Sequence, residues 1–244
     1  MIVAPRQTNR HASGYLLILI CRRNYEKLFA IALCLILGAA LLTGCSDGSD
    51  FRQERYTASA AEVQAINIDV RDRKIEISVS QNDEIHIDYY ESAKESYDFS
   101  VSDDHVLSVT AVTDKNWTDY FGGKAPAEQR VLSVQVPDSL LSSLTVSSTN
   151  EDITLSPLTV TGDVSISANG GDIVLEQLDV GSALTLTAKN GDIRGTVTGG
   201  YDDFAMTSEV KKGTCNLPAH KEGGFKTLNV SNNNGDIQIE FTGS

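Results

Sequence analysis

The sequence predicts an all-β fold: a short single-stranded parallel β-helix, a solenoid of about 20–22 residues per turn, with a hairpin-rich region capping its N-terminal end. Two observations support this prediction. A corner motif recurs at near-constant intervals in the second half of the chain, and apolar residues alternate with polar ones between the corners. An alternation of period two is typical of half-buried strands and excludes the 3.6-residue stripe of a helix.

The corner motif combines a residue suited to a sharp bend with an aspartate and an isoleucine. Its clear copies lie 20, 20 and 44 residues apart, and the wide interval becomes two steps of 22 if Gly213-Thr214-Cys215 is a degenerate copy. Glycine tolerates the left-handed backbone that such a bend needs, and the carboxylate can accept hydrogen bonds from nearby backbone N–H groups. The residues assigned to these structural corners are Asp152, Gly171, Asp172, Gly191, Asp192, Gly235 and Asp236.

The apolar positions of one turn are apolar again 20 residues later. Seven such pairs are Ile153/Ile173, Leu155/Leu175, Leu158/Leu178, Val160/Val180, Val164/Leu184, Ile166/Leu186 and Ala168/Ala188. Stacked turns would place these residues in register at about 4.8 Å and would display a wall of Thr, Ser, Asn and Asp side chains outside.

A row of corner aspartates could also hold calcium, since hard oxygen ligands at close spacing suit that ion. The chain contains neither an EF-hand loop nor the glycine-aspartate nonapeptides of calcium-binding β-rolls. We therefore predict a structural ladder, with no metal site and no cofactor.

Residues 1–44 are predicted to be a signal peptide. Basic residues precede an apolar run from Leu28 to Leu42, which is short for a membrane-spanning helix. The run ends in Leu42, Thr43, Gly44 and Cys45, which resembles the lipobox of a bacterial lipoprotein; the resemblance implies that Cys45 carries acyl chains such as palmitate and anchors the protein to a membrane. The alternative is an uncleaved membrane anchor, and both interpretations export the rest of the chain.

Residues 45–61 are predicted to be the lipidated cysteine and a flexible tether, because they are polar and lack strand periodicity. Residues 1–44 contain five of the 20 basic residues and one of the 33 acidic ones, so the remainder has a net charge of −17. Nucleic acid and bare anionic headgroups are therefore unsuitable partners, and a cationic one fits better. The remainder keeps one other cysteine, Cys215, which is expected to be a buried thiol.

Residues 62–137 form a strand-rich part in which the repeat fades, and residues 138–244 hold the regular repeats. Alternating apolar residues in 66–70, 75–79 and 85–87 predict antiparallel hairpins. A loop within 113–130 contains Trp117, Tyr120 and Phe121. These rings either form a binding surface, or they cover the open end of the coil or pack on the hairpins.

The strand pair around Ile66–Val79, the Val-Gln-Val-Pro segment at Val134–Pro137 and the Asn-Gly-Asp-Ile corners together resemble the DUF4097 family over roughly residues 63–241. Glu151 and Thr214 depart from the corner pattern. The resemblance implies a β-helix lipoprotein of candidate adhesin type and supplies no catalytic residues. Such domains are also similar to ones associated with envelope-stress signalling.

We therefore predict a non-enzymatic lipoprotein, extracytoplasmic and lipid-anchored to the cell membrane, or to the outer membrane of a two-membrane bacterium. Its partner would be an envelope protein, a cell-wall polymer or a host surface. One alternative is an accessory protein that binds a membrane sensor of envelope stress. The other is a β-helix polysaccharide-active enzyme, although His86, His105 and His220 form no spaced ligand or triad motif.

Overall fold

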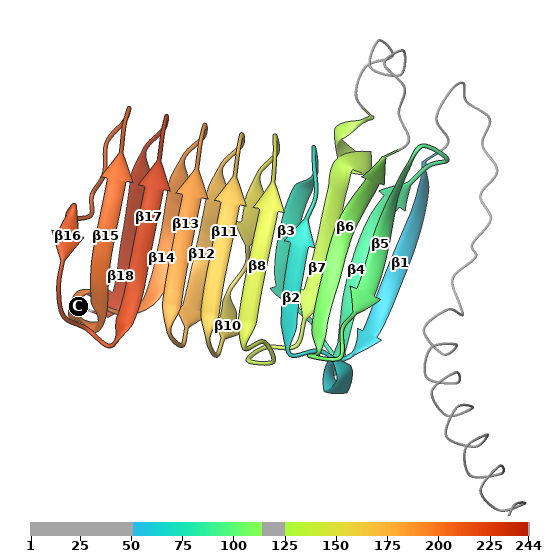
Figure 1. Ribbon diagram of the computed structural model, residues 1–244, viewed down its shortest axis with the longest axis horizontal. Helices are drawn as coiled ribbons and strands as arrows, with labels where there is room; N and C mark the ends of the chain where they lie inside the picture. Colours follow the sequence, from blue (N-terminus) through green and yellow to red (C-terminus); the bar gives the residue numbers. More distant parts are fainter. Residues whose placement is uncertain (1–50, 114–124, 244) are drawn as a thin grey trace, which may run out of the picture. The chain divides into compact units, whose positions relative to one another are not determined.

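The computed structural model describes residues 51–113 and 125–243, which form two sheets around one hydrophobic core (Figure 1). Within these residues each sheet has nine strands, most of them parallel to their neighbours. The helical segments described are short 3₁₀ turns, η2 (Ala60–Glu62), η4 (Ala127–Arg130) and η5 (Tyr201–Asp203). The all-β prediction is confirmed, and no helix of the described residues is long and apolar enough to cross a membrane.

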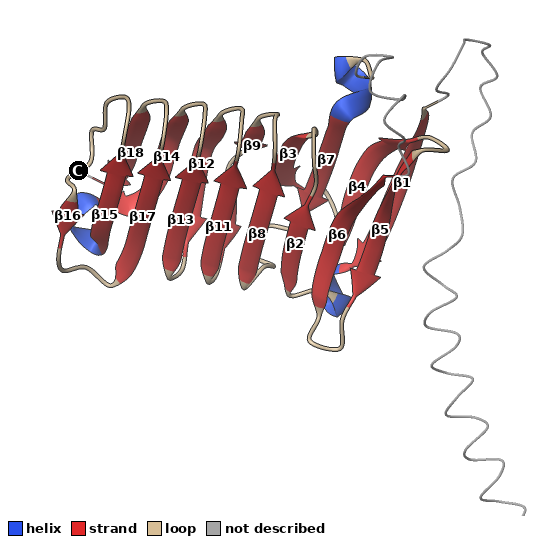
Figure 2. Cartoon of the chain, turned by 45° about the horizontal axis from the view of Figure 1, so that its top comes forward, coloured by secondary structure: helices blue, strands red, loops and turns tan. Residues whose placement is uncertain are grey.

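The strands follow a definite spatial order in each sheet (Figure 2). Sheet A runs β1 (Arg52–Ser59), β4 (Glu84–Glu91), β7 (Val131–Val136), β3 (Lys74–Val79), β9 (Ile153–Leu155), β12 (Ile173–Val180), β14 (Ile193–Gly200) and β18 (Ile237–Gly243), with β10 (Leu158–Val160) also beside β12. Sheet B runs β16 (His220–Lys221), β15 (Phe204–Val210), β17 (Lys226–Asn232), β13 (Ala183–Ala188), β11 (Asp163–Ala168), β8 (Ser143–Ser148), β2 (Ala65–Asp69), β6 (Val106–Thr113) and β5 (Glu95–Val101).

The predicted 20-residue register is confirmed in both sheets. Ile153 of β9 lies opposite Ile173 of β12, and Val164 of β11 lies opposite Leu184 of β13. These side chains point between the sheets and are almost fully buried. Equivalent side chains therefore stack in rows that form the core, as the alternation of apolar and polar residues requires.

The last strands do not follow chain order. Strand β17 lies between β13 and β15, and β18 lies beside β14 at the edge of sheet A. In Figure 1 the red strand β17 therefore separates the orange strands β13 and β15. The corner at Asp236 therefore follows that at Asp192, while Thr214 is outermost. Thr214 therefore ends the ladder of corners, although the two steps of 22 residues in the sequence would place it between Asp192 and Asp236.

The hairpin predicted for residues 66–70 and 75–79 is wrong. Strands β2 and β3 do not form a hairpin: β2 pairs in parallel with β6 and β8 in sheet B, and β3 with β7 and β9 in sheet A. The first strands thus belong to the same parallel stack as the repeats. Ile66 of β2 lies opposite Leu144 of β8, which is 78 residues later in the chain, because strands β3 to β7 come between them in the sequence.

The predicted tether is wrong for residues 52–59. This segment forms β1, which pairs antiparallel with β4 over eight residues, and η2 follows it at Ala60–Glu62. Tyr56 and Ala58 alone of the strand pack against the core, so the apolar alternation is too short to be recognised in the sequence.

Antiparallel strands do cap the N-terminal end, as predicted. Strands β5 and β6 form a hairpin, and β4 pairs antiparallel with β1 and β7. Tyr56 of sheet A stacks on Phe99 of sheet B with ring centroids 4.5 Å apart, and Tyr89 and Tyr97 join them. These rings link the two sheets at this end and contribute apolar area to the closure of the core.

Candidate functional site

The corner aspartates form a continuous hydrogen-bonded ladder. Each Oδ1 accepts from the backbone N–H of the next corner in space: Asp152 from Asp172 at 2.8 Å, Asp172 from Asp192 at 2.8 Å, Asp192 from Asp236 at 2.9 Å and Asp236 from Thr214 at 2.7 Å. The carboxylates thus join successive turns along one edge of the fold.

The glycines of the corners are required by the close approach of neighbouring turns. Gly191 has φ +117°, and a Cβ there would lie 2.2 Å from the carbonyl oxygen of Gly171. Gly235 has φ +143° and would place a Cβ 2.1 Å from the carbonyl oxygen of Gly191. A side chain at either position would separate the turns that the aspartates join.

The ladder lowers the pKa of two of its carboxyl groups, those of Asp172 and Asp236. Burial alone would raise the pKa of Asp172, but the N–H of Asp192 and the guanidinium of Arg194, 2.6 Å from Oδ2, outweigh it and lower the pKa. Hydrogen bonds from Thr214 lower the pKa of Asp236. In the described residues no three His, Cys, Asp or Glu side chains gather as a metal site would require.

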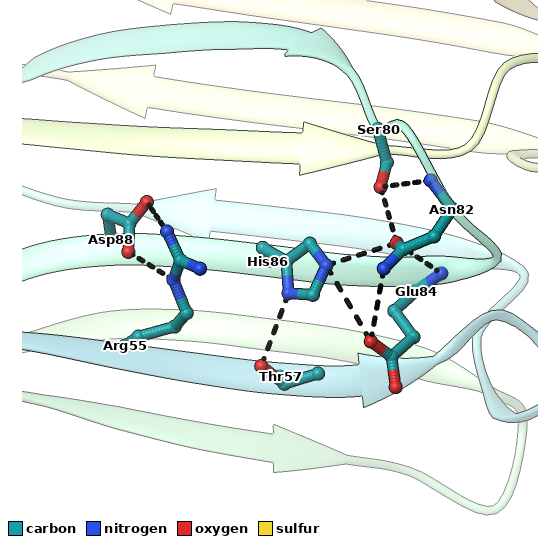
Figure 3. Close-up of polar contacts among 7 residues, drawn as sticks. All are labelled: Arg55, Thr57, Ser80, Asn82, Glu84, His86 and Asp88. Carbon is teal, nitrogen blue, oxygen red and sulfur yellow. Dashed lines mark hydrogen bonds and ion pairs between the residues drawn. The ribbon is translucent and has the colours of Figure 1, made fainter. Parts of the chain in front are cut away.

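A histidine-centred polar cluster lies on the outer face of sheet A near β1 and β4 (Figure 3). Asn82 Oδ1 is 3.0 Å from His86 Nε2 and accepts from Ser80 Oγ at 2.9 Å, while His86 Nδ1 is 3.3 Å from Thr57 Oγ1. Because Asn82 Oδ1 can only accept, we assign the proton to Nε2, so that Thr57 donates to Nδ1.

The polar cluster has the geometry of a strand clamp. The Thr57 hydroxyl bonds His86 across the β1–β4 pair, and the Ser80 hydroxyl bonds Asn82 within the turn between β3 and β4. Beside them Arg55 bonds Asp88 in bidentate fashion at 2.5 and 2.7 Å. The Thr57–His86 and Arg55–Asp88 contacts help to hold β1 on β4.

A second polar group joins the N-terminal cap to the stack. The side chain of Arg73 is 6% exposed, forms an ion pair with Glu95 and donates to Tyr97 Oη at 2.8 Å. Burial lowers the pKa of Arg73, but Tyr97 and Glu95 together raise it. Arg73 therefore fixes β5 to the first corner, and no periodicity in the sequence identifies this contact.

The outer face of sheet B carries two rows of polar residues, which we call the hydroxyl face. Each row crosses seven strands in the spatial order β6, β2, β8, β11, β13, β17 and β15. One row is Ser108, Asn67, Thr145, Ser165, Thr185, Asn229 and Thr207; the other is Thr110, Asp69, Ser147, Ser167, Thr187, Ser231 and Glu209. All are exposed or half-exposed.

The outer face of sheet A is different in character. Its corresponding row crosses β4, β7, β3, β9, β12, β14 and β18 and mixes charged, apolar and polar residues. Its members are Asp88, Ser133, Glu76, Thr154, Val174, Arg194 and Gln238. The two faces of the same stack therefore offer different ligand chemistry.

A shallow groove of about 260 Å³ lies beside β10 and β12, lined by Val79, Asp138, Pro157, Leu158, Thr159, Gln177, Asp179 and Thr198. Both of its carboxylates have partners: Asp138 Oδ1 accepts from the N–H of Thr159 at 2.8 Å, and Asp179 pairs with Lys226 at 3.1 Å. Both carboxylates of the groove therefore take part in contacts that hold the fold together.

Several predicted site residues lie outside the described residues. They are the lipobox with Cys45, namely Leu42, Thr43 and Gly44, and the aromatic residues Trp117, Tyr120 and Phe121. The structure describes the flanks of the aromatic segment, where Thr113 pairs with Glu95. Cys215 lies at the outermost corner, opposite Ile237, and is half-buried against the core, less enclosed than expected.

The comparisons with known proteins agree with this geometry. The Toastrack DUF4097 family model matches residues 63–244. None of the curated proteins compared with the chain matches it.

Solved structures similar to the chain come from several bacteria. A "putative cell adhesion protein" from Clostridium sporogenes has 12% identity and a TM-score of 0.55, covering 79% of this chain and all of its own. A "putative adhesin" from Parabacteroides distasonis has 11% identity, a TM-score of 0.29 and coverage of 80% and 96%. Another from Bacteroides fragilis has 13% identity, a TM-score of 0.30 and coverage of 80% and 100%. The first of these likenesses is one of fold.

Proposed function

Because the chain belongs to the Toastrack DUF4097 family, we propose that it is a non-enzymatic adhesin-type binding module, built as a flattened β-solenoid and displayed outside the cell by lipid on Cys45. The hydroxyl face is the observation that carries this proposal. It is a broad surface of polar side chains fixed on paired strands, so ordering them on binding costs little.

The polar groups described favour binding over catalysis. Hydrolysis of a glycosidic bond needs two placed carboxyl groups with a substrate between them, and Asp138 and Asp179 already hold structural partners. His86 lies between an amide and a threonine hydroxyl. The groove that Asp138 and Asp179 line is shallow. A flat display surface makes better use of this geometry.

The lipid anchor would hold the module close to the membrane. Residues 46–51 are all that separate Cys45 from β1, which bonds to β4 along its whole length. An extended chain of this length reaches at most about 25 Å. The module is thus presented beside the membrane surface at its N-terminal end.

Crosslinking in intact cells tests the proposal, with the full-length chain as bait and Cys45→Ala as the mislocalised control. We expect the wild-type bait to capture an envelope protein or polymer that the control does not. Specific recovery of one membrane protein would favour the sensing accessory over free adhesion. Equal capture by both baits would contradict anchored display, and turnover of a captured polysaccharide would contradict a non-enzymatic role.

A further inference from the structure

The chemistry of the hydroxyl face is unusually uniform for this chain. Its fourteen positions comprise ten hydroxyl side chains, two amides and two carboxylates, and none is a lysine or arginine. The carboxylates, Asp69 and Glu209, lie toward opposite ends of one row. Its centre, on β8, β11 and β13, is a block of six hydroxyls, although the chain has a net charge of −13.

The side chains of this face are largely free to bond outward. Among the described residues one side-chain hydrogen bond involves them, from Ser231 Oγ to Thr187 Oγ1 at 3.4 Å. The strands beneath are paired on both sides from β2 to β17, so the positions of the hydroxyls are fixed by the backbone. Neighbours in a row are about 4.8 Å apart and the rows about 6.6 Å apart, which makes a regular two-row array.

We propose that the hydroxyl face binds an uncharged polysaccharide whose repeating hydroxyls align with the two rows. This inference rests on the proposed binding function and assigns it a face and a ligand class. Hydroxyls and amides both donate and accept, so they complement sugar hydroxyls in either direction. The face has no cation to neutralise phosphate or uronate groups, and the acidic chain repels them.

The ligand must be a polymer, because each exchange of water for a sugar hydroxyl gains little by itself. Contacts across successive strands add up only if one chain engages several of them at once, as in multivalent binding. The rows contain no aromatic side chain on which a single sugar could stack. Affinity is therefore expected to rise with polymer length, with short oligosaccharides binding at least tenfold more weakly.

The test uses the full chain in detergent and measures its retention on insoluble cellulose and chitin, with polygalacturonate as the anionic comparison. The central-row variant, Thr145→Val/Ser165→Val/Thr185→Val, replaces the three central hydroxyls of one row with β-branched apolar side chains, which strands accommodate. The matched control, Ser133→Val/Thr154→Val/Thr196→Val, makes the same changes on sheet A. We expect at least a tenfold loss of retention for the first variant and less than twofold for the second, at equal unfolding midpoints.

The outcomes separate this inference from the function on which it rests. Failure of the wild type to bind either neutral polymer, equal retention on polygalacturonate, or undiminished binding by the central-row variant would overturn it. If cellular capture by the wild-type bait nevertheless persists, the binding function stands with another ligand or face. Loss of cellular capture in the central-row variant alone would support both.

Discussion

At the scale of single residues, Asn216 closes an edge that the backbone leaves open. Strand β18 is the last of sheet A, and its outer side is covered by one backbone bridge, from Cys215 to Ile237. The next outward position, Ile239, bonds instead to the amide of Asn216: its N–H donates to Oδ1 at 3.0 Å, and its carbonyl accepts from Nδ2 at 2.8 Å. One side chain thus replaces a strand and protects the edge against pairing with another chain.

Asn216→Ala should lower the free energy of unfolding by about 1–2 kcal/mol, because it leaves both groups of Ile239 without a protein partner while water still reaches that edge. Denaturant unfolding measures the effect. Asn229→Ala is the matched control, because Asn229 is exposed and makes no side-chain hydrogen bond within the described residues; its effect should stay within about 0.5 kcal/mol. Equal effects of the two substitutions would show that water satisfies the N–H and carbonyl groups of Ile239 as well as Asn216 does.

The corner aspartates make stability depend on pH in a definite direction. The pKa of Asp172 is lower in the folded chain than its ordinary value of 3.8, so the unfolded chain takes up the proton first as pH falls. Its contribution is therefore present above about pH 5 and is lost as pH falls through 3.8 and below. Asp172→Asn should be less stable than wild type at pH 6 and should lose less stability between pH 5 and 3.

Denaturant midpoints measured at each pH test this prediction. The control is Asp103→Asn, at an exposed turn where the side chain makes no hydrogen bond in the described part of the chain. Parallel curves for Asp172→Asn and wild type would indicate that the ladder does not perturb this carboxyl.

At the scale of elements, β17 joins sheet B from inside, between β13 and β15, while β18 ends sheet A beside β14. Strand β15 has only β17 and the two-residue β16 as neighbours, so its place in sheet B depends on a segment that follows it in the chain. Buried Leu228, Val230, Ile237 and Ile239 supply the core at this point. Residues 201–243 should therefore fold as one cooperative unit.

Truncation after Phe225 should remove the protection of β15 as well as of the deleted strands. Backbone amides of Phe204–Val210 are expected to exchange at rates typical of an unfolded segment, while those of β11 stay protected. Adding a peptide of residues 226–244 should restore protection by filling the gap. Persistent protection of β15 in the truncated chain would show that it docks directly on β13.

The sequence predicts which strands are equivalent better than it predicts their spatial order in the sheets. Apolar alternation and the corner motif identify which residues are equivalent, as in the confirmed register of Ile153 and Ile173. Equivalence does not say which turn lies next in space, because Asp236 and Thr214 fit either position beyond Asp192. Strand β1 was missed because two core residues are too few to show a period.

At the scale of the whole molecule, the two outer faces differ in composition and the two ends differ in strand arrangement. The predicted wall of Ser, Thr, Asn and Asp side chains could be anticipated from the alternation, but its confinement to sheet B could not, since assignment to a face requires the strand topology. The N-terminal end combines the aromatic closure, the Arg73 contacts and β1, which leads directly from the expected anchor. The remaining predicted site residues, in the lipobox and the aromatic loop, stay predictions.

The short connection between Cys45 and β1 leads to a test of orientation. Sheet B spans eight strand spacings from β5 to β16, about 38 Å, which exceeds the reach of about 25 Å allowed by residues 46–51. In a Cys215→Ser background, a fluorophore at Lys94→Cys, beside β5, should be quenched by nitroxide lipids far more than one at Glu222→Cys, beside β16. Inserting a 20-residue Gly-Ser linker after Ser46 should reduce the difference, because the module would then be free to turn. Cys45→Ala should abolish quenching at both positions. Equal quenching of the two labels without the inserted linker would mean that the module lies along the membrane, with β16 as close to the lipid as β5.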